Sequence, residues 1–263
     1  KTIGNNKFTI VYNGELYNTE EVRKKLLTAG FRFDSYSDTE VLLTSYIHYG
    51  KECLQHLNGI YAFAIWDERK KELFMARDRM GVKPLFYYQE GESLLFGSEI
   101  KALLDHPDVE PVIDEKGIME LFGLGPARGR DSGVFKGIRE LKPGFRLIFN
   151  RKGLKKEQYW QLKTNPHNED FVTTVEHVRE LFIDSVQRQL VSDMPVCTFL
   201  SGGLDSSAIS SVTADYFKEK ERRLDTYSID YKDNELYFAK DDYQPNSDSD
   251  WIPRVVDKIN SKH

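Results

Sequence analysis

The sequence has 263 residues, of which 40% are hydrophobic and 30% are charged, a globular composition long enough for one large domain or two ordinary ones. A net charge of −5 excludes the strongly basic surface that attracts nucleic acid, and no apolar run approaches the roughly 20 residues that cross a membrane. Cys53 and Cys197 are too few for a disulfide framework or a metal cluster. Both are interpreted as small core residues, and without a signal-peptide pattern they favour a cytoplasmic protein.

Short strands dominate the first part of the chain, up to about residue 160. These segments alternate apolar with polar residues and are separated by Gly, Asp or Pro turns, as is typical of antiparallel sheets. The basic run 151–156 carries its own glycine, which favours a solvated turn over an anion-binding patch. The segments expected to be strands are 7–13, 60–67, 71–77, 85–89, 93–98 and 145–150.

Two helices are expected to interrupt these strands. The first spans residues 19–29, and Gly30 supplies its C-terminal stop. The second spans residues 37–49 and begins with a capping box, in which the Ser37 hydroxyl accepts from the Glu40 amide while the Glu40 carboxylate reaches back.

The pattern changes near residue 160, and the polar stretch 163–170 is the predicted linker. Apolar residues at helical spacing then predict a helix over 171–190. A strand, a helix and a second strand follow, an order that favours a parallel sheet with a crossover helix. These three elements are expected at 196–200, 206–217 and 225–230.

The stretch "FLSGGLDSS" at 199–207 is the most specific motif, because an apolar strand runs directly into Ser-Gly-Gly and a helix start. Gly202 and Gly203 permit close approaches that a Cβ would block, so successive amides can converge on an anion at the helix N-terminus. No Gly-Lys-Ser/Thr follows, so this is not a Walker loop. Asp205 is expected to hold Mg²⁺, and the hydroxyls expected to donate to phosphate oxygens are those of Ser201, Ser206 and Ser207.

This loop resembles the SGGxDS loop of the ATP-pyrophosphatases, which cleave ATP between its α and β phosphates. Before it, "YNGELYN", "SDTE", "NGIYAFAIWD", "RDRMGVKPLFY" and "FGSEIKAL" follow in the order seen in class II glutamine amidotransferase domains, which have an N-terminal-nucleophile fold. Asparagine synthetases join these two domains, glutaminase first. The resemblance implies a two-domain α+β and α/β protein, with a glutaminase domain at 1–160 and the start of a parallel-sheet ATP-pyrophosphatase domain at 161–263.

The same resemblance assigns a role to the Asn-Gly pair in the opening stretch. Amide hydrolysis passes through a tetrahedral oxyanion, which needs preorganised donors. By resemblance, the Asn13 side chain and the Gly14 amide form this oxyanion hole and contact glutamine, whose α-ammonium group is bound by Glu15 and Asp38. Leu200 and Ile229 match the positions that contact adenine in the family.

Three residues of "RDRMGVKPLFY" are interpreted differently. Arg77, Asp78 and Gly81 are expected to fix a turn beneath the glutamine site rather than to touch substrate.

The function implied is the synthesis of asparagine from aspartate, glutamine and ATP through a β-aspartyl-AMP intermediate, with Mg²⁺ as cofactor. Class II glutaminases use the thiol of their first residue as the nucleophile, whereas Lys1 offers none. The chain is therefore expected to be an inactive internal piece of a longer polypeptide.

Two alternatives remain open. One is a relative of the β-lactam synthetases, which share the two-domain plan and close a ring within their own adenylated substrate. The other is a binding module that holds glutamine or a nucleotide without turnover. The sequence does not fix the oligomeric state, and a homodimer is one assembly that the resemblance leaves open.

Overall fold

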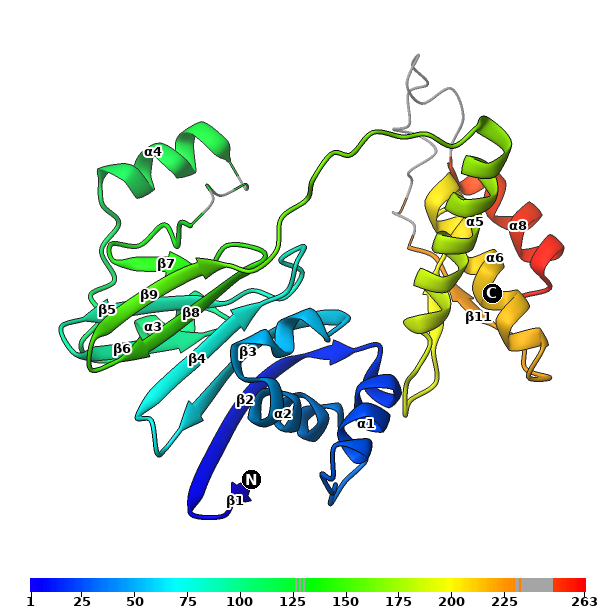
Figure 1. The fold of residues 1–263 in the computed structure, drawn as a ribbon. Coiled ribbons are helices and arrows are strands. Elements are labelled where there is room, and N and C mark those ends of the chain that lie inside the picture. Colours follow the sequence, from blue (N-terminus) through cyan, green and yellow to red (C-terminus); the bar gives the residue numbers. More distant parts are fainter. Residues whose placement is uncertain (126, 128, 130, 230–231, 233–247) are drawn as a thin grey trace. The chain divides into compact units, whose positions relative to one another are not determined.

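The computed structural model describes residues 1–125, 127, 129, 131–229, 232 and 248–263, and the chain divides into two compact units, Lys1–Asn165 and Pro166–His263 (Figure 1). The first unit contains β1 (Thr2–Ile3), β2 (Asn6–Leu16), α1 (Thr19–Thr28), α2 (Asp38–Tyr49), the short 3-10 helix η1 (Gly50–Gln55), β3 (Gly59–Asp67), β4 (Glu72–Arg77), β5 (Phe86–Glu90), β6 (Ser93–Gly97), α3 (Ile100–Leu104), α4 (Glu115–Leu124), β7 (Ile138–Glu140), β8 (Phe145–Asn150) and β9 (Gly153–Gln158). The second contains α5 (Phe171–Arg188), β10 (Cys197–Phe199), α6 (Leu204–Lys218), β11 (Asp225–Tyr227), η2 (Asp248–Trp251) and α8 (Ile252–Ile259).

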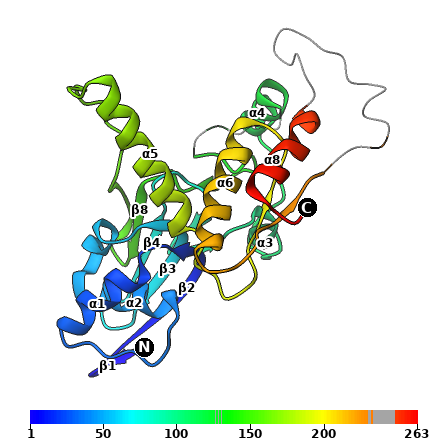
Figure 2. The ribbon, with the colours of Figure 1, turned by 90° about the vertical axis from the view of Figure 1, so that its right-hand side faces the viewer.

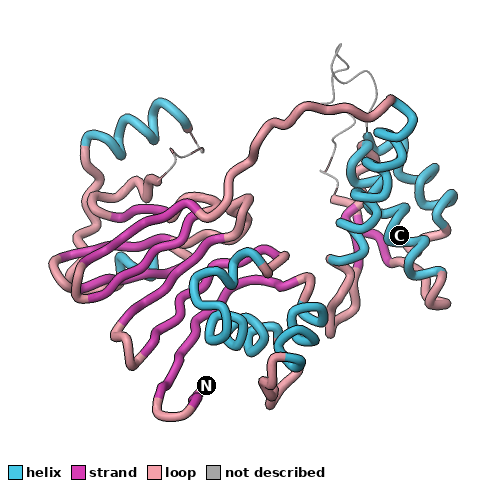
Figure 3. Tube along the Cα trace, in the orientation of Figure 1, coloured by secondary structure: helices cyan, strands magenta, loops and turns pink. Residues whose placement is uncertain are grey.

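Antiparallel sheets organise the first unit (Figure 3). One sheet has six strands in the order β1-β2-β3-β4-β8-β9, and the other has three in the order β6-β5-β7. Every pairing within them is antiparallel. The six strands expected from the alternation of apolar and polar residues are all present, so that prediction is confirmed.

The core of the first unit lies on both faces of the six-stranded sheet. Side chains of β3 alternate, so Phe63 and Ile65 face the helices while Ala62 and Ala64 face the three-stranded sheet. Helices α1 and α2, which lie side by side in Figure 2, bury Val22, Leu26, Val41 and Leu42 against the first face. Burial on both faces fixes the register of β3, because a slip by one residue would exchange its two faces.

The basic run 151–156 is not simply a solvated turn, and this prediction is corrected. Residues 153–158 form the edge strand β9, in which Leu154 pairs with Phe149 and Lys156 with Leu147. Only the tip at Asn150–Gly153 turns. Hydrogen bonding along β8 prolongs the hairpin past the glycine, which the charge pattern alone did not indicate.

The predicted capping box at the start of α2 is wrong in its details. The Ser37 hydroxyl accepts from the Thr39 amide at 3.1 Å. The Glu40 carboxylate binds the amides of Asp34 and Ser35, and also the ammonium of Lys1. These donors lie in the loop before the helix and at the start of the chain. Glu40 therefore stabilises the loop that contains Asp34 and Ser35 instead of capping the helix.

In the second unit, β10 and β11 pair in parallel and α6 connects them, as the strand-helix-strand pattern predicts. Helix α6 lies between α5 and α8 (Figures 1 and 2). Much of the apolar side of α5 is exposed, including Val175 and Val178, whereas Val186 is buried. No helix among the described residues is long and apolar enough to cross a membrane.

The two cysteines differ in their surroundings. Cys53 is completely buried in η1, as predicted, but Cys197 is exposed, so its assignment to the core is wrong. The reason is the alternation of β10: the Thr198 hydroxyl bonds Ser210 of α6 at 2.8 Å. Cys197 and Phe199 therefore point to the other face, which the described residues leave uncovered.

Candidate functional site

The Asn-Gly pair lies near the end of β2, in register with β3. Asn13 is opposite Ala62 and Gly14 is opposite Tyr61. Strand alternation exposes Asn13 and Glu15 on the same face, while Gly14 points toward the helix-covered face. The structure thus brings the predicted oxyanion donors and one predicted carboxylate to one end of one strand.

Gly14 is sterically required at its position. A Cβ built on it would lie 2.3 Å from the Ile60 carbonyl oxygen and 2.8 Å from the Tyr61 Cα, both of which are backbone atoms. Neither can move aside without displacing β3. The close approach of two strands, rather than an unusual φ angle, therefore excludes a side chain here.

The Asn13 side chain has a partner that the sequence did not indicate. Its Nδ2 donates to the Ser98 Oγ at 3.1 Å. Ser98 directly follows β6 of the three-stranded sheet, so this hydrogen bond links the Asn13 side chain on β2 to the end of β6. The only sequence signal was the position of Ser98 inside the "FGSEIKAL" segment.

Asp38 is brought to the same end of β2 from the first turn of α2. Its Oδ2 accepts from the Tyr12 hydroxyl at 2.9 Å and from the Leu16 amide at 3.2 Å. Burial, together with the negative charges of Asp38 and Glu15, raises the pKa of Tyr12. The Tyr12 hydroxyl and the Leu16 amide therefore hold the Asp38 carboxylate beside the end of β2.

A hydrogen-bonded turn lies behind β3, as predicted for Arg77, Asp78 and Gly81. Asp78 is 1% exposed, and its carboxylate accepts from the amides of Met80, Val82 and Lys83 at 2.9–3.1 Å. The Asp78 amide donates to the carbonyl of Tyr61, the residue opposite Gly14. The Arg77 guanidinium donates to the carbonyls of Gly81, Lys83 and Leu141. The segment therefore forms a hydrogen-bonded turn, as predicted, whereas its place beneath a glutamine site stays a prediction.

The phosphate-loop motif lies at the carboxyl end of β10, beside the parallel strand β11 and before α6. Gly202 has φ +92°, a left-handed conformation that favours glycine. Gly203 is the N-cap residue of α6. Among the described residues, the amides of Gly202, Leu204, Asp205 and Ser206 donate to no carbonyl. The first turn of α6 therefore leaves backbone donors free for an anion.

The serine hydroxyls of the loop are engaged within it. Ser206 and Ser207 donate to the Gly203 carbonyl at 3.2 and 2.7 Å. The Ser201 hydroxyl accepts from the Gly203 amide at 3.4 Å and contacts the Ser206 hydroxyl at 2.9 Å. In this arrangement the hydroxyls stabilise the loop, and among the described residues the groups left without a hydrogen bond are backbone amides.

The remaining predicted nucleotide residues are placed unequally. Leu200 is completely buried, and its amide donates to Tyr227 of β11 at 2.8 Å. Ile229 is 76% exposed beyond the end of β11, so it has a surface open to a ligand. Asp205 is exposed in the first turn of α6. The described residues contain no group of three or more His, Cys, Asp or Glu that could hold a metal, but one carboxylate suffices where phosphates and water supply the other Mg²⁺ ligands.

Two protein families match the chain. Residues 3–160 match the glutamine amidotransferase domain, and residues 177–263 match asparagine synthase. Since the first match covers more than half of the chain, the chain belongs to the glutamine amidotransferase domain family.

Curated relatives extend this likeness over nearly the whole chain. The chain is 54% identical over 257 residues to asparagine synthetase (glutamine-hydrolyzing) 3 of Bacillus subtilis, covering 97% of this chain and 42% of that protein. It is 33% identical over 258 residues to a putative asparagine synthetase (glutamine-hydrolyzing) 2 of Methanocaldococcus jannaschii, covering 97% and 47%. The chain thus spans less than half the length of these relatives.

Among solved structures, the chain is similar to glutamine phosphoribosylpyrophosphate amidotransferase of Bacillus subtilis. This similarity has a TM-score of 0.43 and 20% sequence identity, and covers 92% of this chain and 50% of that chain.

Proposed function

We propose that this chain is part of an enzyme that makes asparagine from aspartate with ATP, using ammonia released from glutamine. In this proposal residues 1–160 belong to the glutaminase domain and residues 161–263 to the ATP-pyrophosphatase domain. The observation that supports it is the grouping, in one chain, of the residues predicted for each of two sites. One presents Asn13 and Gly14 with two carboxylates, and the other presents free amides at the carboxyl end of a parallel strand.

At the first site, each residue type fits one requirement of amide hydrolysis. The Asn13 side chain and the Gly14 amide would stabilise the oxyanion, a role in which the loss of one donor typically costs about 3 to 4 kcal/mol. Glu15 and Asp38 would bind the glutamine α-ammonium group. The nucleophilic thiol of such enzymes belongs to a first-residue cysteine, and neither cysteine of this chain is at that position.

At the second site, the amides of residues 202 and 204–206 would bind the phosphates of ATP. The hydroxyls of Ser201, Ser206 and Ser207 would join them by turning out of the loop, and Ile229 with Leu200 would flank the adenine. Asp205 would hold Mg²⁺, which neutralises charge on the triphosphate. Adenylation of the aspartate β-carboxylate would form β-aspartyl-AMP and pyrophosphate, and ammonia would then displace AMP.

We further propose that the enzyme works in the cytoplasm on small molecules, without a nucleic acid or membrane partner, and that it assembles as a homodimer. The net charge of −5 supports the absence of a nucleic-acid partner. Sedimentation of the full-length protein tests the dimer.

The function is tested by supplying the full-length protein with glutamine, aspartate and Mg-ATP, and measuring glutamate, AMP and asparagine. All three products are expected. Replacing glutamine with ammonium chloride should bypass the first site, so Asn13→Ala should abolish the glutamine-dependent reaction and spare the ammonia-dependent one. AMP without asparagine would point to a cyclising relative, and the absence of both AMP and glutamate to a binding module.

A further inference from the structure

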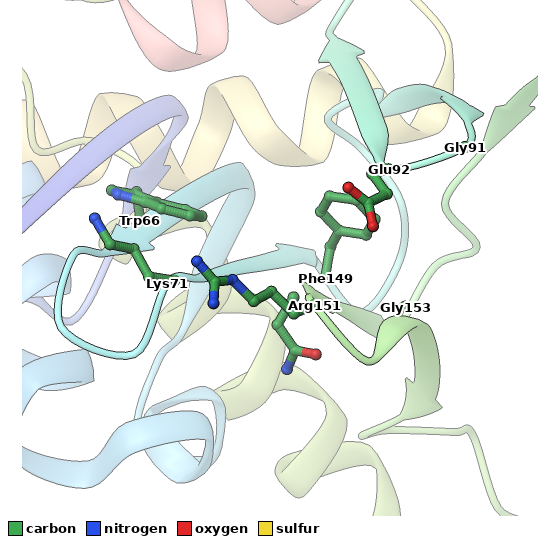
Figure 4. A pocket seen from close by; sticks show the side chains of 8 residues that line it. Trp66, Lys71, Gly91, Glu92, Phe149, Arg151 and Gly153 are labelled. Atoms are coloured by element: carbon green, nitrogen blue, oxygen red, sulfur yellow. The ribbon is translucent and has the colours of Figure 1, made fainter.

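A cavity of about 440 Å³ opens at the end of the first unit where three hairpin turns meet (Figure 4). None of the residues assigned above to the glutamine or nucleotide site lines it. We call it the turn cavity. Its lining residues are Trp66 and Lys71 from the β3–β4 hairpin, Gly91 and Glu92 from the β5–β6 turn, and Phe149, Asn150, Arg151 and Gly153 from the β8–β9 hairpin.

Aromatic side chains form the wall of the turn cavity. Trp66 pairs with Leu73, and Leu73 pairs with Phe149, so these three residues make one row across β3, β4 and β8. Strand alternation puts Trp66 on the same face as Ala62 and Ala64, the face that packs against the three-stranded sheet. The cavity is therefore the open end of the apolar layer between the two sheets.

A cation that no described residue pairs with lies at this aromatic wall. Arg151 makes no hydrogen bond or ion pair with any residue that the structure describes, and its guanidinium extends from the β8–β9 turn toward Trp66 (Figure 4). Lys71 differs, because its ammonium is paired with Glu68, which also accepts from the Trp66 indole at 2.6 Å. Arg151 thus offers a free fork of donors beside an aromatic surface.

The opposite rim carries a negative charge. Glu92 projects beside the Phe149 ring in Figure 4, away from the Arg151 guanidinium. A ligand with two widely separated anionic groups would meet repulsion there, whereas a single anionic group beside Arg151 would not. The charges at the rim therefore favour a monoanion.

We propose that the turn cavity binds a small aromatic monocarboxylate. The carboxylate would accept two parallel hydrogen bonds from Arg151, for which the planar guanidinium is well suited. The ring of the ligand would lie against Trp66 and Phe149, since offset or edge contacts between aromatic rings are favourable. The cavity volume falls in the range of about 300 to 1,000 Å³ that is usual for small-molecule sites.

This site is separate from the predicted oxyanion hole. Asn13 pairs with Ala62, and Trp66 lies four residues further along β3. At about 3.3 Å per residue, the two positions are about 13 Å apart along the strand. Binding of a ligand in the turn cavity therefore depends neither on the predicted glutamine site nor on glutaminase activity.

The test is a calorimetric titration of the full-length protein with phenylacetate, followed by amide chemical shifts in NMR spectra. Saturable binding is expected, with the largest shifts at Gly91 and Gly153. Two related probes separate the charge from the ring: neutral phenylacetamide and ringless acetate should each bind at least tenfold more weakly.

Substitution of Arg151 tests the proposal more directly. Arg151→Gln should weaken phenylacetate binding at least tenfold without a change in thermal stability, because Arg151 is exposed and has no partner among the described residues. Lys152→Gln is the matched control, since this neighbouring cation does not line the cavity, and it should bind as the parent does. Equal affinity of Arg151→Gln, equal binding of phenylacetamide, no saturable binding, or shifts confined to another surface would each overturn the proposal.

Discussion

The Tyr12 hydroxyl donates to the Asp38 carboxylate across 2.9 Å, and so joins β2 to the first turn of α2. Tyr12 immediately precedes Asn13, so the strand that carries the proposed oxyanion donors is tied to the helix that carries a proposed glutamine-binding carboxylate. The Leu16 amide adds a second bond to the same carboxylate oxygen. The first turn of α2 is thus held against the end of β2 by one side chain and one amide.

Tyr12→Phe should therefore raise the KM for glutamine about tenfold in the full-length protein and leave kcat nearly unchanged, because it frees Asp38 without touching the reacting atoms. Burial and the neighbouring carboxylates raise the pKa of Tyr12, so the hydroxyl keeps its proton and the effect should be constant from about pH 6 to 9. Steady-state glutaminase kinetics measure this. Tyr36→Phe, at a residue 94% exposed, is the control, and an unchanged KM in Tyr12→Phe would contradict the role of Tyr12.

Gly14→Ala should lower the thermal stability of the protein and abolish glutaminase activity, because the new methyl group would meet the Ile60 carbonyl oxygen at 2.3 Å. Gly123→Ala makes the same chemical change in α4, where a Cβ would have nothing within 4 Å. That control should be neutral or more stable by up to about 1 kcal/mol, since alanine favours the helix. The prediction fails if the two variants melt at the same temperature.

Glu40 should contribute to stability in a pH-dependent manner. Partial burial acts to raise its pKa, but hydrogen bonds from Lys1, Asp34 and Ser35 outweigh this and lower it from 4.5 to about 2. A carboxyl group with a lowered pKa in the folded state stabilises the protein above its unfolded pKa, and this contribution is lost as the pH falls from about 4.5 toward 2.

Urea unfolding of Glu40→Gln at two pH values measures that contribution. The variant should be less stable than the parent at about pH 6, and the difference should shrink toward about pH 2. Glu110→Gln, a change at an exposed carboxylate, should show no such convergence. A stability difference that stays constant with pH would rule out the ionised Glu40 as its source.

Gly202→Ala should reduce asparagine formation at least tenfold while glutamine hydrolysis continues. The left-handed φ of +92° at Gly202 is costly for a residue with a Cβ, by about 1 to 2 kcal/mol, and a changed loop would turn its free amides away from the phosphates. Ser211→Ala, further along α6, should retain both reactions. Parallel assays of AMP and glutamate formation test this prediction. Loss of both products in Gly202→Ala would contradict it and would indicate general unfolding.

Much of the fold was predictable from the sequence, because the signals involved are local. Alternating apolar residues with turn glycines identified the antiparallel strands of the first unit, and a strand-glycine-helix order identified the loop at 199–207 and the parallel pair around it. Side-chain direction within a strand and the φ angles open to glycine depend on a few neighbouring residues. The roles predicted for Asn13, Gly14 and Asp38 came instead from the resemblance of their motifs to a known family, because local pattern alone favours a structural role for Asp38.

Tertiary structure alone decided which groups meet. The hydrogen bonds Tyr12–Asp38 and Asn13–Ser98 join residues that are 26 and 85 positions apart. The Glu40 carboxylate binds a loop rather than the end of its own helix, and Cys197 faces away from the core. The turn cavity is the clearest case, because residues from three hairpins that are distant in sequence line it. The sequence shows Arg151 only as a charged turn residue, whereas the structure places it beside the aromatic residues of other strands. Strand order and register determine such contacts, and these depend on long-range packing that no local pattern records.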